Sequence, residues 1–245
     1  MSYQWNWGVF GQETVVGDGA TYADWMIAGL KMTVTVSLSA WVLALLVGGV
    51  IGVLRTVPNK GLRTVATAYV ELLRNIPLLV QLFIWYFIVP ELLPTTWGTA
   101  IKQLPPDVQQ LSAAIVCLGL FTSARVSEQV RAGIESLPVG QTRAALALGL
   151  TLPQAYRLVL LPMALRLIVP PLTSEFLNIF KNSAVCSTIG LLELAAQGRQ
   201  LVDYTAQPYE SFIAVTAMYL LINVVVMVLM SWLERRVKVP GYMGQ

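Results

Sequence analysis

Six charged or hydrogen-bonding residues fall within segments of the chain that are otherwise apolar. Such groups are costly inside a membrane and usually face a cavity or a partner, so they mark candidate sites of polar chemistry. Cationic side chains bind carboxylates, and carboxylates bind ammonium groups. The candidates for a substrate pathway are Arg125, Glu128, Glu175, Lys181, Asn182 and Ser183.

Two interpretations of these residues stay open from the sequence alone. Arg125 and Glu128 are three residues apart, as are Glu128 and Arg131, so each pair could neutralise itself on one helix face. In the alternative, Arg125 and Lys181 bind the carboxylates of a substrate, and Glu175 binds its amino group or neutralises Lys181. Snorkelling of Lys181 to the membrane surface is an equally simple account.

Residue types that carry most enzyme chemistry are missing or badly placed. Histidine is absent from all 245 residues, which excludes histidine-based acid–base catalysis, serine–histidine triads and most zinc sites. Cys117 and Cys186 lie in apolar runs and are expected to be small buried residues, not a disulfide framework. No carboxylate cluster has the spacing of metal ligands. A membrane-embedded enzyme is therefore disfavoured, and no catalytic or metal-binding residue is predicted.

The composition favours the lipid bilayer as the chain's solvent. Hydrophobic residues make up 56% of the sequence and charged residues only 12%, about half the share usual in soluble domains. The net charge of +3 is modest, and no basic cluster alternates with aromatic residues, so nucleic-acid binding is not expected. Residues 1–24 lack the pattern of a cleavable signal peptide.

Five apolar segments predict five transmembrane helices, because about 20 such residues span a bilayer core. The fold class expected is an all-α polytopic membrane protein, organised as one transmembrane domain over residues 1–245. Asn75, Pro77 and Gln81 predict a kink in the second span. The predicted spans are residues 28–54, 65–89, 108–130, 167–188 and 211–233.

Basic residues gather on one set of loops, which the positive-inside rule places in the cytoplasm. With five spans, the N-terminus is then periplasmic and the C-terminus cytoplasmic. The basic flanks hold Arg55, Lys60, Arg63, Arg131, Arg143, Arg157, Arg166, Arg235, Arg236 and Lys238, whereas the opposite flanks hold only Lys31, Lys102 and Arg199.

The cytoplasmic segment 140–164, GQTRAALALGLTLPQAYRLVLLPMA, combines small residues, a glycine and a proline at a defined spacing. Ala144 and Ala145 are followed by three residues and Gly149, and nine further residues lead to VLLP, which ends in Leu161 and Pro162. The small residues allow a close seat in a partner's groove, and the glycine permits a sharp turn. The proline marks the boundary between the second short helix and the next span. An amphipathic connector on the membrane surface would explain the composition but not the spacing.

This segment resembles the EAA loop of bacterial ABC importer permeases: Glu-Ala-Ala, three residues, Gly, nine residues, Ile-x-Leu-Pro. The stretches YVELLRNIPLLVQLFIWYF and EFLNIFKNSAVCSTIGLLEL resemble the polar amino acid uptake family. NWGVF, PPLTSEF and ERRVKVPGYMG are most similar to family members that carry glutamate and aspartate. The resemblance implies a type I importer transmembrane domain. One departure is Arg143 at the position of the glutamate, which implies a different pairing with the ATPase.

The resemblance implies a non-catalytic permease subunit in the bacterial inner membrane that forms half of a translocation pathway. It needs no cofactor, and it lacks a Walker-type glycine loop. The implied partners are an ABC ATPase dimer that binds ATP and Mg²⁺, a second homologous permease or a second copy of the chain, and a periplasmic amino-acid-binding protein. The residues expected to couple to the ATPase are Arg143, Ala144, Ala145, Gly149, Leu161 and Pro162.

Two other kinds of transporter stay as alternatives. An ion-coupled secondary transporter is disfavoured because no inverted repeat is visible and the EAA-like loop has no role in one. A permease of the same family for another polar amino acid is the nearer alternative.

Overall fold

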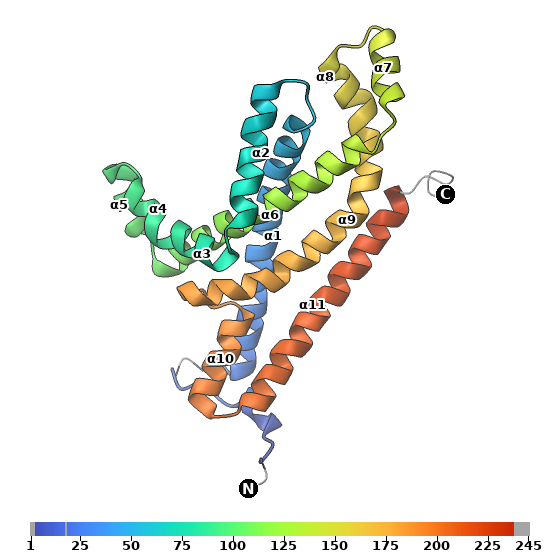
Figure 1. Ribbon diagram of the computed structural model, residues 1–245. Helices are drawn as coiled ribbons and strands as arrows, with labels where there is room; N and C mark the ends of the chain where they lie inside the picture. The colour runs from blue at the N-terminus through green and yellow to red at the C-terminus, as the bar shows by residue number, and fades with distance from the viewer. Residues whose placement is uncertain (1–2, 18, 238–245) are drawn as a thin grey trace. The chain divides into compact units, whose positions relative to one another are not determined.

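The computed structural model describes residues 3–17 and 19–237 (Figure 1). Over these residues the chain is helical almost throughout, and its extended backbone pairs only in an isolated antiparallel bridge between Glu13 and Thr21. The all-α prediction is confirmed. Lys238 and the end of the ERRVKVPGYMG motif lie outside the described residues.

Long α-helices alternate with short helical segments, of which η1 and η4 are 3₁₀-helical and η2 and η3 are π-helical. In chain order the elements are η1 (Trp7–Gly11), α1 (Tyr22–Leu54), α2 (Lys60–Asn75), α3 (Leu78–Phe83), η2 (Ile84–Ile88), α4 (Val89–Leu92), α5 (Thr95–Lys102), α6 (Pro106–Glu135), α7 (Val139–Ala147), α8 (Leu152–Ala155), η3 (Tyr156–Leu160), α9 (Leu161–Asn182), η4 (Ser183–Ile189), α10 (Leu194–Thr205) and α11 (Pro208–Val237).

By length and composition, four described helical runs can cross a membrane, and a fifth can if one bent pair counts as a single span. Each predicted span falls within one of them, although the fourth run begins at Leu152, well before the predicted start at residue 167. The runs are Tyr22–Leu54, the bent pair Lys60–Asn75 and Leu78–Leu92, Pro106–Glu135, Leu152–Ile189 and Pro208–Arg236.

The second span is broken, not merely kinked. Its two halves meet at 104° across Ile76 and Pro77. Ile76 has extended backbone angles, φ −100° and ψ 127°. A proline disfavours the helical conformation of the residue before it and lacks the N–H that would continue the hydrogen-bond ladder. The predicted kink at Pro77 is therefore confirmed as a change of chain direction.

The fourth span starts earlier than the sequence indicates. The second helix of the 140–164 loop and the span that follows it form one helical run, Leu152–Ile189. Pro162 lies at the start of α9, as expected, but the helical run is not interrupted there. It occupies the first turn of α9, directly after the π-helical segment η3, where a missing N–H is tolerated.

The helices pack in two compact units, each assembled from three stretches of chain. The first unit comprises Met1–Ala40, Leu78–Leu118 and Ile179–Val225, and the second comprises Trp41–Pro77, Gly119–Asn178 and Val226–Gln245. The single domain over residues 1–245 stays a prediction.

In the second unit, α1 packs tightly on α6 through glycines. A Cβ atom added at Gly48 would lie 2.6 Å from the carbonyl oxygen of Ser123, and one added at Gly52 would lie 2.6 Å from Cβ of Val130. Glycine is therefore required for this close approach. The core that continues from this contact is Ala44, Val126, Val130, Ile134, Leu137, Leu160, Ala164 and Ile168.

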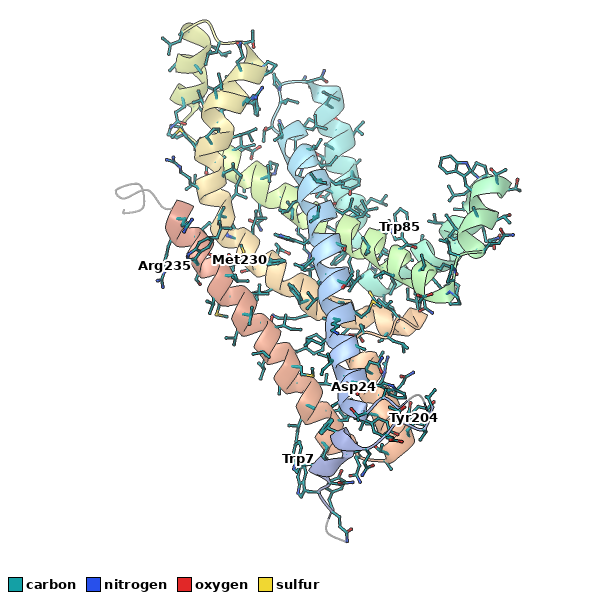
Figure 2. All side chains as sticks on the ribbon, turned by 180° about the vertical axis from the view of Figure 1, so that it is seen from behind. Trp7, Asp24, Trp85, Tyr204, Met230 and Arg235 are labelled. Atoms are coloured by element: carbon teal, nitrogen blue, oxygen red, sulfur yellow. The ribbon has the colours of Figure 1, made fainter. Side chains whose placement is uncertain are left out.

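In the first unit, Glu193 organises the start of α10. Its side chain is fully buried and caps the helix by accepting hydrogen bonds from the backbone N–H groups of Ala195 and Ala196. Cys117 and Cys186 are buried and free, as expected. Figure 2 shows Trp7, Asp24 and Tyr204 gathered at the end of this unit where α1 and α11 begin.

Candidate functional site

The second unit contains a cavity of about 340 Å³ between α2, α6 and α9. Three residues that the sequence marks as candidates, Arg125, Glu128 and Glu175, meet in its wall. The complete lining is Arg74, Phe121, Arg125, Glu128, Gln129 and Glu175. A polar cavity with both signs of charge is a suitable place for a small zwitterionic ligand.

Glu128 is the centre of an ion-pair network. Its carboxylate accepts a 2.7 Å hydrogen bond from Arg55 Nη1 at the end of α1, and it also pairs with Arg131 one turn further along α6. Arg131 pairs in turn with Glu135. Arg74 of α2 lies 3.8 Å from the same Glu128 oxygen that Arg55 binds. Glu128 is therefore committed to joining α1, α2 and α6.

Arg125 has a different partner from the one that its spacing suggests. It lies 3.8 Å from Glu175 of α9, and its guanidinium stands 4.9 Å from the centre of the Phe121 ring. Self-pairing of Glu128 with Arg131 is observed, whereas Arg125 pairs with Glu175. The Glu175 Oε2 atom is buried and makes no hydrogen bond.

Lys181, Asn182 and Ser183 belong to the first unit and are not among the residues that line this cavity. Lys181 is exposed at the end of α9, and Asn182 is half-buried. Ser183 is buried and donates a 2.7 Å hydrogen bond to the carbonyl oxygen of Phe180. Its hydroxyl is therefore engaged within the helix.

Sequence reasoning missed four residues of the site. From the sequence, Arg74 was only a charged residue within the second apolar segment. Arg55 was only one of the basic residues that flank the spans. Phe121 and Gln129 carry no signal of their own. A helical-face count along α6 would have found both, because Phe121 and Gln129 lie four residues before and after Arg125 and so share its face.

The 140–164 segment forms a helical hairpin. α7 ends in a turn at Gly149, whose φ of +84° favours glycine. At the start of α8, the Thr151 N–H donates a 2.8 Å hydrogen bond to Gln154 Oε1. Leu148, which the sequence analysis did not single out, is 83% exposed beside the turn.

The predicted coupling residues do not all lie on the hairpin's surface. Arg143, Ala144 and Pro162 are exposed, whereas Ala145 is buried and Leu161 packs against the core of the second unit. Ala145 is therefore small because it packs within the hairpin, and Ala144 is the small residue that a partner could contact.

The sequence profile of the "Binding-protein-dependent transport system inner membrane component" family matches residues 42–239. The chain belongs to this family. The matched range contains every residue of the cavity and the whole hairpin.

Individual relatives agree with the family. "Glutamate/aspartate import permease protein GltJ" of Escherichia coli K12 is 55% identical over 245 residues, which is all of this chain and 99% of the relative. "Glutamate/aspartate import permease protein GltK" of E. coli O6:H1 is 31% identical and aligns 86% of this chain with 93% of its own length. The solved "amino acid ABC transporter with histidines" has a TM-score of 0.72 and 32% identity, covering 88% of this chain and 95% of its own. The chain is thus an amino acid ABC permease with the transmembrane fold of type I importers.

Proposed function

We propose that this chain is the membrane-spanning permease subunit of an ABC importer for glutamate and aspartate. The observation that carries the proposal is the 55% identity over the full chain to a glutamate/aspartate import permease. The cavity supports it, because the guanidinium groups of Arg74 and Arg125 suit a substrate with two carboxylates. On this proposal, the substrate passes the cavity formed by Arg125, Glu128 and Glu175, and Lys181, Asn182 and Ser183 belong to another part of the pathway.

Energy for transport comes from a separate ATPase dimer that binds ATP and Mg²⁺, so the chain itself catalyses no reaction. The ATPase docks on the 140–164 hairpin, and its closure moves the hairpin as a rigid body. Arg143, Ala144 and Leu148 supply the exposed contacts, and Gly149 sets the turn. Arg143 meets a carboxylate of the ATPase, which reverses the polarity expected where the loop carries glutamate.

The remaining partners are a periplasmic binding protein and a second permease subunit. The N-terminus is periplasmic and the C-terminus cytoplasmic, and a periplasmic binding protein delivers the amino acid. A second, homologous permease forms the other half of the pore. A heterodimer is favoured over a homodimer, because two different relatives of this chain carry the same glutamate/aspartate description.

The proposal is tested by reconstituting the complete transporter in proteoliposomes and measuring ATP hydrolysis with glutamate-loaded binding protein. Loaded binding protein should stimulate hydrolysis in the wild type, and Gly149→Asp should abolish the stimulation because the turn requires a positive φ. Gly140→Ala is the matched control, since a Cβ there meets no atom within 4 Å. Absence of an associated ATPase, or unchanged stimulation in Gly149→Asp, contradicts the coupling role.

A further inference from the structure

The charged residues around the cavity of the second unit differ in how closely they are paired. Glu128 is occupied by its close contacts to Arg55 and Arg131. Arg74 lies 3.8 Å from that carboxylate, and its side chain is 49% exposed. At this distance Arg74 makes no hydrogen bond to Glu128. Arg74 is therefore the most weakly held partner of Glu128, and its half-exposed guanidinium faces the cavity.

The Arg125–Glu175 pair is also loose. The two charged atoms are 3.8 Å apart, beyond hydrogen-bond distance. The Glu175 side chain is only 13% exposed, and its Oε2 atom is buried without a hydrogen bond. A buried carboxylate left in this condition is costly, so a donor that reaches it is bound favourably. The Arg125 side chain is 43% exposed and its guanidinium lies over Phe121, so it can turn to a ligand without leaving its helix.

The charge balance specifies the sign of the ligand. The charged residues that line the cavity balance, since Arg74 and Arg125 face Glu128 and Glu175. The ion pairs that extend from them add Arg55, Arg131 and Glu135, so this connected set of described residues has one positive charge in excess. A ligand with one net negative charge neutralises this set. An acidic amino acid has that charge at neutral pH, whereas its amide has none.

We propose that Arg125 and Glu175 form an intramembrane charge filter that selects acidic amino acids over their amides. This inference rests on the proposed function and adds a discriminating step within the permease to the selection made by the binding protein. The substrate's ammonium group binds Glu175, and its side-chain carboxylate binds Arg125, so the ligand replaces a loose internal pair by two close ones. Arg74 receives the α-carboxylate.

The filter discriminates because an amide cannot complete the exchange. Glutamine provides the ammonium group for Glu175 but only a neutral oxygen for Arg125. Charge-assisted hydrogen bonds are roughly twice as strong as neutral ones, and the guanidinium would also lose the carboxylate that held it in the empty state. A site built for a charged partner therefore rejects the uncharged isostere strongly.

The test measures binding of radiolabelled glutamate and glutamine to the complete transporter in nanodiscs, without binding protein or ATP. The wild type should bind glutamate at least tenfold more tightly than glutamine. Arg125→Gln should reduce this preference to less than threefold, Arg125→Lys should retain most of it, and Glu175→Gln should weaken both ligands. Arg199→Gln neutralises an exposed cation outside the cavity and should match the wild type.

A second measurement distinguishes a loss of selectivity from a loss of folding or assembly. Assembled Arg125→Gln transporter in proteoliposomes should import at least tenfold less glutamate per ATP hydrolysed than the wild type, and Arg125→Lys less than threefold. An unchanged preference and unchanged import per ATP in Arg125→Gln overturn the filter, as does a wild type that binds neither amino acid without binding protein. If the wild type with its binding protein imports neither glutamate nor aspartate, the proposed function itself fails, which is a separate result.

Discussion

The hydroxyl group of Tyr219 donates a 2.8 Å hydrogen bond to Glu193 Oε2 and so joins α11 to the first turn of α10. The same carboxylate caps α10. Glu193 is fully buried, so solvent does not replace it as the acceptor for these donors. One carboxylate thus serves as both a helix cap and a link between helices.

Glu193→Ala should lower the free energy of unfolding by about 2 kcal/mol or more, because it leaves buried donors without an acceptor. Tyr219→Phe should cost less, about 1 kcal/mol, since it removes one hydrogen bond and the cap survives. Thermal melting of the detergent-solubilised transporter measures both. Equal melting temperatures for Glu193→Ala and the wild type would contradict the role of the cap.

Three neighbouring glycines of α1 should respond differently to the same substitution. Gly48→Val and Gly52→Val place a side chain within 3 Å of α6 and should sharply reduce the yield of monodisperse protein. Gly49→Val is the matched control, because a Cβ at Gly49 meets no atom within 4 Å. Size-exclusion profiles of the three variants decide the matter, and equal losses at all three positions would show that sterics at α6 are not the cause.

Leu148→Asp should prevent the ATPase from docking without disturbing the fold, because this leucine is 83% exposed beside the hairpin turn. We expect at least a tenfold loss of co-purifying ATPase with an unchanged melting temperature of the permease. Leu104→Asp, at another exposed leucine, serves as the control. Full ATPase recovery with Leu148→Asp would place the docking contact elsewhere.

Glu128→Gln should destabilise the second unit by about 3 kcal/mol, because it leaves a buried cation unpaired. The cation is Arg55, whose side chain is 7% exposed. Glu91→Gln breaks an exposed pair with Lys102 and should have almost no effect. The two melting temperatures provide the comparison, and a similar small change in both would mean that Arg55 is solvated in the folded protein.

Hydropathy predicted the positions of the helices well, since a span's composition is a local property. The spacing of small residues, glycine and proline indicated the loop of residues 140–164, and Pro77 indicated the kink. The size of that kink, 104°, was not predictable, because a proline permits a range of chain directions and packing chooses among them.

The pairing of charges within the site was predictable only for Glu128 and Arg131, whose spacing indicated the pair that is observed. Spacing along α6 suggests Arg125 with Glu128, yet Arg125 meets Glu175, fifty residues away, and Glu128 meets Arg55. These partners are fixed by which helix faces touch, and a single sequence does not contain that information. The residue types and the segment were predictable, and the geometry was not.

The broken second span has a consequence for biosynthesis. α2 has 16 residues and, at ~1.5 Å per residue, extends about 24 Å, less than the about 30 Å of a bilayer core. It also carries Glu71 and Arg74, and within its unit it is held by the hydrogen bond of Tyr69 to Ser123 on α6. The translocon therefore receives this segment before the helix that stabilises it has been synthesised. We expect stable insertion of α2 to await α6, so that the translocon releases these helices to the lipid as a group.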